Sequence, residues 1–170
     1  MIYKFRIILD IEDDVFRDIE ISKHDTLEDF QNAIVQAFGF DGGEMASFYL
    51  SNDSWEQGEE YPLFDVGESE IPLQLMADTQ IDDVVEKEHD RLIFIYDFLS
   101  MWTFLVELMQ ISEAESIVLY PRLIFSHGIV PEEAPEKFFE TDFNESNEDF
   151  DDFGMDEDDL DNLDFDINLN

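Results

Sequence analysis

The sequence contains no cysteine. Without a thiol the chain can form no disulfide, no thiolate zinc site and no cysteine nucleophile. It has only three histidines, and each of them lies in or beside a predicted turn without a partner at the spacing of a metal site or a catalytic triad: His24, His89 and His127. We therefore expect no catalytic residue, no cofactor and no bound metal.

Positive charge is also scarce, because 45 acidic residues stand against eight basic ones and give a formal net charge of -37. Proteins bind duplex nucleic acid with Lys and Arg that displace counterions from the phosphates, so this balance disfavours direct nucleic-acid binding. The four arginines are spread over different predicted strands: Arg6, Arg17, Arg91 and Arg122. They do not form the cluster that a DNA recombinase needs around its nucleophilic serine.

Long apolar runs are missing, since no segment approaches the roughly eighteen uninterrupted apolar residues of a membrane span. The first residues, MIYKFRIILDIEDD, place Lys4 and Arg6 inside the apolar run and offer no small-residue cleavage site. They are typical of a first strand and not of a signal peptide. We expect a cytoplasmic protein without a membrane partner, because an acidic surface is repelled by anionic lipid.

What the sequence does have is a strongly apolar stretch over residues 91–109, RLIFIYDFLSMWTFLVELM. Its two halves alternate with period two and are rich in aromatic and β-branched residues, which is typical of paired strands. We interpret it as the central hairpin of a sheet. A second hairpin is predicted over residues 2–21, with a polar turn at 12–14.

A helix is predicted after this amino-terminal hairpin. Thr26 and Asp29 have the spacing of a capping box, an apolar stripe follows, and Gly39 stands where a left-handed helix stop is expected. Residues 45–51 indicate a short strand and 52–70 a long loop. A second capping box, Thr79 with Asp82, predicts a short helix.

Residues 117–125 indicate a last strand, which Pro121 places at an edge or a bulge. This order predicts an α+β fold, with a largely antiparallel sheet, helices on one face and a β-grasp-like first half. The predicted domain spans 1–135. Residues 136–170 form an acidic tail, which low hydrophobicity and self-repulsion predict to be disordered.

Several short motifs in order resemble the plasmid pRiA4b ORF-3-like family. They are DDVFRDIEISKHDTLEDFQNAIVQAFGF (13–40), TQIDDVV (79–85), IYDF (95–98) before a Trp, and YPR (120–122) followed by PEE (131–133). The resemblance covers roughly residues 1–135 and implies mainly a fold. Family members are often labelled transposon passengers or resolvases, without an established activity.

The chain departs from the family pattern after the Tyr-Asp-Phe strand. The family usually has Gly-Asp and later Trp-x-His there, whereas this chain has Leu-Ser-Met-Trp-Thr-Phe at 99–104. A cysteine and a Gly-Gly pair that the family often has near Tyr-Pro-Arg are missing as well. Apolar residues thus replace the polar ones of any site in this region.

Asp97 is the acid of most interest, because it is flanked by apolar residues in the strand that we expect to be most buried. A buried carboxylate needs a partner, and Arg122 of the Tyr-Pro-Arg motif is the natural candidate. One interpretation is a structural ion pair between Asp97 and Arg122. The other is a ligand-binding or enzymatic site between the two strands, to which Tyr96, Trp102 and Tyr120 contribute.

The acidic tail threads apolar residues through its carboxylates, among them Phe150, Phe153, Leu160, Leu163, Phe165 and Ile167. Tracts of this kind can fold onto a basic and apolar groove of a partner, or they can serve only solubility. Both interpretations stay open.

The leading hypothesis is a non-enzymatic protein-interaction module whose partner has a basic and apolar surface, accessory to a mobile element or to a protein that handles DNA. The alternatives are mimicry of nucleic acid by the acidic tail, or the ligand site near Asp97 and Arg122.

Overall fold

The computed structural model describes residues 1–65, 67 and 71–135, which belong to the compact unit Met1–Pro135. The tail predicted at 136–170 lies outside the described residues. The elements, in chain order, are β1 (Ile2–Leu9), β2 (Phe16–Ser22), α1 (Leu27–Phe38), β3 (Ala46–Leu50), β4 (Glu60–Pro62), two 3-10 turns (Met76–Asp78 and Ile81–Asp83), β5 (Arg91–Tyr96), β6 (Trp102–Ser112) and β7 (Arg122–His127).

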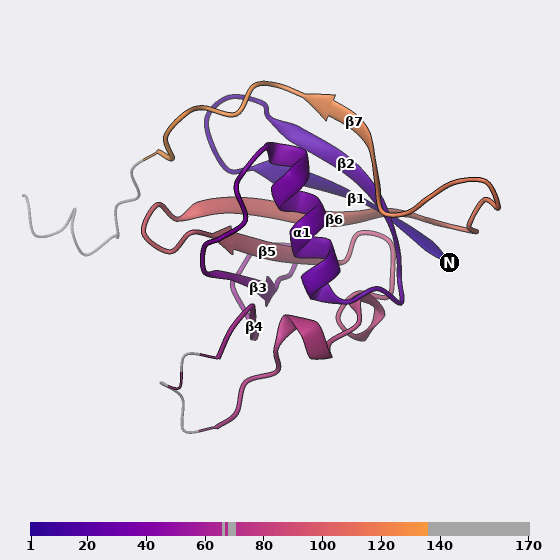
Figure 1. Cartoon of the computed structure of the whole chain (residues 1–170), viewed down its shortest axis with the longest axis horizontal. Helices are drawn as coiled ribbons and strands as arrows, with labels where there is room; N and C mark the ends of the chain where they lie inside the picture. Colours follow the sequence, from indigo (N-terminus) through magenta and orange to yellow (C-terminus); the bar gives the residue numbers. More distant parts are fainter. Residues whose placement is uncertain (66, 68–70, 136–170) are drawn as a thin grey trace, which may run out of the picture. The chain divides into compact units, whose positions relative to one another are not determined.

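The strands form one seven-stranded sheet in the order β4-β3-β5-β6-β1-β2-β7, and every neighbouring pair is antiparallel. The predicted α+β class is confirmed, and α1 lies across one face of the sheet (Figure 1). The β5–β6 hairpin is confirmed in the middle of the sheet. A hairpin, a helix and a strand follow one another as in a β-grasp, with β5 and β6 between β1 and β3.

The core lies between α1 and the sheet because both elements are amphipathic. Alternate residues of β1 are buried, as the period-two pattern predicts. Four contacts connect buried Phe rings from the amino-terminal strand to the central hairpin: Phe5–Phe30, Phe30–Phe48, Phe48–Phe94 and Phe94–Phe104, with centroids 4.5 to 5.6 Å apart. Each buried Phe contributes about 2–3 kcal/mol by area. This aromatic layer fixes the helix on the sheet.

The local signals of α1 are confirmed. The Thr26 Oγ1 accepts the N–H of Asp29, the Asp29 carboxylate accepts the N–H of Thr26, and both distances are 3.1 Å. Gly39 ends the helix at φ 82°, a left-handed conformation that glycine adopts without strain. The described part of the chain contains no helix that is both long enough and apolar enough to cross a membrane.

Three boundaries differ from the sequence expectation. The second capping box joins Gln80 and Asp83, one residue later than predicted, because the Thr79 hydroxyl donates to the Leu75 carbonyl and ends the preceding turn instead. The predicted loop over 52–70 contains β4. The last strand starts only at Arg122, since Pro121 has no N–H to pair; the predicted edge position is confirmed.

Candidate protein-interaction surface

The predicted ion pair between Asp97 and Arg122 is wrong. Asp97 lies just after β5, in the β5–β6 turn, with φ 64°. Its Oδ1 accepts the N–H groups of Leu99 at 3.2 Å and Ser100 at 3.4 Å. Aspartate tolerates the left-handed conformation and accepts hydrogen bonds from the residues that follow it. The carboxylate therefore caps a partly exposed turn and needs no cation.

Arg122 pairs with Glu20 instead, at 2.8 Å from Nε to Oε1, across the β2–β7 ladder. Three strands lie between β5 and β7, so the structure separates the residues that the sequence grouped. Tyr120 lies beside Arg122, with the guanidinium 5.8 Å from its ring.

Tyr96 and Trp102 face each other across β5 and β6 and pack on Phe40. The Tyr96 hydroxyl accepts the N–H of Gly42 at 2.8 Å. No shared site therefore joins Tyr96 and Trp102 to Tyr120 and Arg122.

Metal-ligating side chains do not gather in the part of the chain that the structure describes, where no three His, Asp or Glu residues are placed to hold an ion. The His89 Nδ1 lies 2.8 Å from Glu107, His24 lies 3.5 Å from Asp82, and the ring of His127 stacks on Phe16. The histidines thus make ordinary turn and surface contacts.

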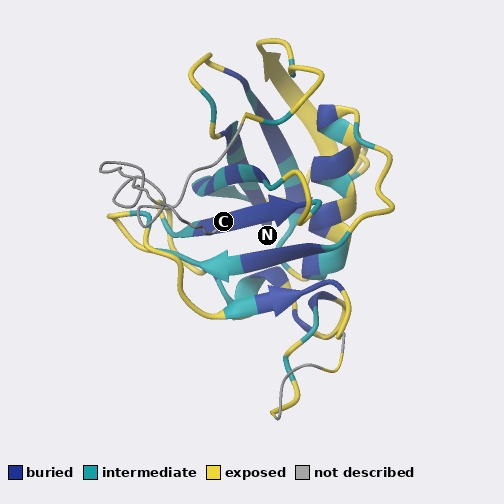
Figure 2. Ribbon diagram, turned by 90° about the vertical axis from the view of Figure 1, so that its left-hand side faces the viewer, coloured by how far each residue is buried: buried dark blue, intermediate teal, exposed yellow. Residues whose placement is uncertain are grey.

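The feature that stands out is β7, whose six residues are all exposed (Figure 2). Leu123, Ile124 and Phe125 keep 47%, 37% and 51% of their surface open to solvent. β7 is the last strand in the sheet order, so no strand of the described chain lies beyond it. The opposite edge of the sheet is protected against pairing with another strand, because β4 has only three residues and ends in Pro62.

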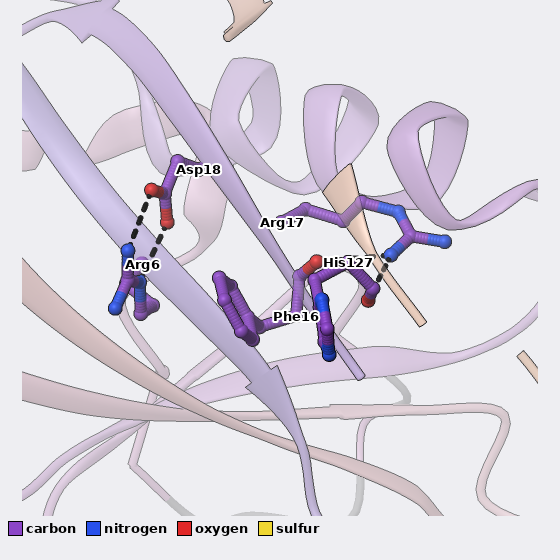
Figure 3. Close-up of polar contacts among 5 residues, drawn as sticks. All are labelled: Arg6, Phe16, Arg17, Asp18 and His127. Carbon is purple, nitrogen blue, oxygen red and sulfur yellow. Dashed lines mark hydrogen bonds and ion pairs between the residues drawn. The ribbon is translucent and has the colours of Figure 1, made fainter. Parts of the chain in front are cut away.

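Arg17 holds β7 in place, and sequence reasoning missed its role. It occupies an inward position of β2 and is only 9% exposed. Its Nη1 donates to the carbonyl oxygens of Phe16 and His127, both at 2.9 Å (Figure 3). Its Nε donates to the carbonyl oxygen of Ala37, in the last turn of α1, at 3.2 Å. The guanidinium also lies 4.9 Å from the ring centroid of Phe38.

These bonds join β2, β7 and α1 through one side chain. Helix α1 has no basic residue in its last turn, so Arg17 supplies the cation that a helix carboxyl end favours. Burial lowers the pKa of Arg17, as desolvation of a cation requires. The available signal was one charged residue among apolar inward positions, namely Val15 just before β2 and Ile19 and Ile21 within it.

On the opposite face of the sheet, β1 and β2 carry a bidentate ion pair. The Arg6 Nε and Nη2 donate to the two carboxylate oxygens of Asp18, both at 2.9 Å (Figure 3). The hydrogen bonds that Arg6 donates to the Asp18 carboxylate raise the pKa of Arg6. The Arg6 guanidinium also covers the Phe16 ring at 4.4 Å, and Phe16 contacts Phe125 of β7 at 5.8 Å. Phe125 therefore packs on the Phe16 ring, which Arg6 covers from the neighbouring strand β1, but it stays half exposed.

A groove runs between β7 and α1. It consists of two adjoining hollows of about 210 and 320 Å³, which share Ala33, Gln36 and Pro121. The larger hollow also has Asp25 and Asp29 in its wall. Burial first, and then the like charge of Asp29, raises the pKa of the Asp25 carboxyl. The amino end of β7 therefore borders a negative, partly desolvated site.

Gly128 fixes the other end of β7. It has φ 85°, and a Cβ there would overlap the carbonyl oxygen of Asp14 and lie 2.9 Å from the Cα of Val15. The chain can pass this close to the β1–β2 turn only without a side chain. This contact brings the acidic turn of residues 12–14 beside the carboxyl end of β7.

The predicted docking residues of the tail fall outside the described residues: Phe150, Phe153, Leu160, Leu163, Phe165 and Ile167. They stay a sequence prediction.

No curated protein matches this chain. A solved structure that is similar is a protein of unknown function, MM3350, from Methanosarcina mazei Go1. It has 21% sequence identity and a TM-score of 0.64, over 77% of this chain and 72% of that one. This likeness concerns the fold alone.

Residues 1–157 match the family described as plasmid pRiA4b ORF-3-like protein, as the motifs of the hairpin, the helix and the Tyr-Pro-Arg segment predict. The chain belongs to the plasmid pRiA4b ORF-3-like protein family.

Proposed function

We propose that the Met1–Pro135 unit is a non-enzymatic protein-interaction domain and that the β7 edge is its contact surface. The observation that carries the proposal is the exposure of Leu123, Ile124 and Phe125 on an edge strand. Exposed apolar side chains are ordinary when scattered, but grouped ones favour an interaction site. Further exposed apolar residues flank the strand: Ile117, Leu119 and Ile129.

The contrast between the two sheet edges supports this assignment. Natural sheets protect their edges with short strands, proline or lysine, because an open edge aggregates. β4 has two of these devices, whereas the six residues of β7 contain neither proline nor lysine. Arg17 and Gly128 nevertheless hold β7 in a defined position. An open edge that is also held firmly favours a contact surface over a frayed end.

Charge indicates the kind of partner. With a net charge of -37, the chain attracts basic surfaces and repels acidic ones over about a Debye length. The partner that we propose therefore presents apolar side chains together with Lys and Arg.

The test is affinity capture from extracts of the protein's own cells with three full-length chains. They are the unaltered protein, Leu123→Lys/Phe125→Lys, and the control Phe98→Lys/Leu99→Lys. The control changes two apolar residues of the β5–β6 turn, which are 40% and 96% exposed. Both double variants add the same charge, so only position differs.

We expect at least one protein to be captured by the unaltered and control chains and lost with the β7 variant. That protein, once purified, should bind the unaltered chain directly. Thermal melts must first show that both variants are folded. The same proteins captured by all three chains would exclude β7 as the contact surface.

A further inference from the structure

We propose that β7 binds its partner by strand addition, taking up an extended segment whose centre is apolar and whose ends carry Lys or Arg. The proposal rests on the function proposed above and names its binding mode. Three observations on the described chain carry it, namely the backbone edge, the two-faced placement of apolar side chains, and the charges at the two ends of β7.

The backbone edge is the first observation. β7 pairs with β2 on one side only, from Glu20 with Arg122 to Phe16 with His127. In an antiparallel ladder, alternate residues direct their N–H and C=O groups away from the paired strand. On β7 these groups meet no further strand of the described chain. Another extended segment can therefore satisfy them, as in known cases of strand addition.

The side chains are the second observation. Leu123 pairs with the inward residue Ile19 and lines the groove beside α1, whereas Phe125 pairs with Asp18 and packs on Phe16 at the opposite face. Both remain about half exposed. An added strand places its own side chains alternately on the two faces, so it would cover both residues at once.

The register shift between Asp18 and Ile19 limits how much of β7 an added strand can use. A bulge of this kind strengthens the local twist and is one way of protecting an edge. Together with Pro121 it confines regular pairing to a short stretch. Six residues at about 3.3 Å each span roughly 20 Å, so the partner segment is short.

The charges are the third observation, and they determine the occupant. Asp25 and Asp29 line the hollow next to Pro121, near the start of β7. Exposed Asp13 and Asp14 lie near the carboxyl end of β7, in the turn against which Gly128 packs. An extended segment with Lys or Arg at both ends places opposite charges together at both positions. A second copy of this acidic chain would instead bring like charges together.

The test uses synthetic peptides of about ten residues with the full-length chain. The parent peptide has two Lys at each end and alternating Val and Ile between them, so that both faces of its centre are apolar. Two derivatives carry N-methyl groups on alternate residues, one along each edge of the extended peptide. A fourth peptide has Glu in place of Lys. Binding is measured by fluorescence anisotropy at low salt and at physiological salt.

We expect one methylated derivative to bind at least about tenfold more weakly than the parent, because it loses backbone donors along the edge that faces β7. The derivative methylated along the other edge should bind within a few-fold of the parent. The Glu peptide should not bind measurably. Leu123→Lys/Phe125→Lys should weaken parent binding by about tenfold or more, and Phe98→Lys/Leu99→Lys should leave it unchanged.

Three results would overturn the proposal. They are no measurable binding of the parent peptide, equal affinity of the parent and both methylated derivatives, or an equal loss of affinity in both methylated derivatives. A dimer of the full-length chain, seen in sedimentation and lost in the β7 variant, would also overturn it, because the occupant would then be a second copy. The outcome of the capture experiment does not depend on any of these peptide results. If the capture experiment loses a partner with the β7 variant while the peptides give one of these contrary results, the proposed function stands and only strand addition is refuted.

Discussion

Replacing Gly128 by alanine is expected to lower the free energy of unfolding by about 2–5 kcal/mol, with β7 released from the β1–β2 turn. The first reason is the left-handed conformation, φ 85°, which costs a residue with a Cβ about 1–2 kcal/mol. The second is overlap of the new Cβ with the backbone of Asp14 and Val15, and overpacking adds about 1–3 kcal/mol. Urea unfolding followed by circular dichroism measures the sum.

Gly39→Ala is the matched control. Gly39 has nearly the same φ, 82°, but nothing lies within 4 Å of the position of its Cβ. Only the conformational part applies there, so we expect a loss of about 1–2 kcal/mol. Equal losses for the two substitutions would mean that β7 is not held by a close approach at Gly128.

Replacing Arg17 by methionine is expected to destabilise the protein by about 2–4 kcal/mol, although methionine keeps an unbranched apolar stem that can fill part of the same space. The substitution leaves the carbonyl groups of Phe16, His127 and Ala37 without the donor they have now. A buried polar group that loses its partner costs about 1–3 kcal/mol, and water will reach some of these three. Thermal and urea unfolding provide the measurement.

Two further variants separate the reasons for this loss. Arg17→Lys keeps the positive charge but not the planar group that reaches three carbonyls at once, so its stability should fall between those of the unaltered protein and Arg17→Met. Arg122→Met removes an exposed arginine of β7 and should change stability little. If Arg17→Met proved as stable as Arg122→Met, the role of Arg17 as the anchor of β7 would be refuted.

The local elements could be predicted from the sequence because their signals are local. The capping box of Thr26 and Asp29, the stop at Gly39 and the alternation in β1 each depend on a few neighbouring residues. The central hairpin was also clear, because its strands are adjacent in the chain and strongly apolar. These features together were sufficient for the fold class, whereas the family was indicated by the resemblance of several short motifs in order.

The candidate site could not be predicted because it depends on contacts between distant parts of the chain. Arg122 lies 102 residues from Glu20, and Arg17 lies 110 residues from His127. No periodicity reveals which strands become neighbours. Asp97 was misplaced for a different reason. Apolar residues on both sides of it indicated a strand, but an aspartate at the end of a strand readily adopts a left-handed turn.

The exposure of β7 escaped prediction as well. Leu123, Ile124 and Phe125 have the composition of a buried strand, and Pro121 indicated only that the strand lies at an edge or a bulge. Whether such a strand is covered depends on the layers around the sheet, and α1 together with β2 leaves it open. The apolar composition of an uncovered edge is what connects this fold to a proposed role in binding.

Amide hydrogen exchange on the full-length chain, with and without the purified partner from the capture experiment, tests the central claim most directly. We expect the amides of residues 122–127 to exchange at least about tenfold more slowly in the complex, because an added contact closes the open edge of the sheet. Protection found only elsewhere in the chain, with β7 exchanging at the same rate in both samples, would contradict the assignment of β7 as the surface through which this protein acts.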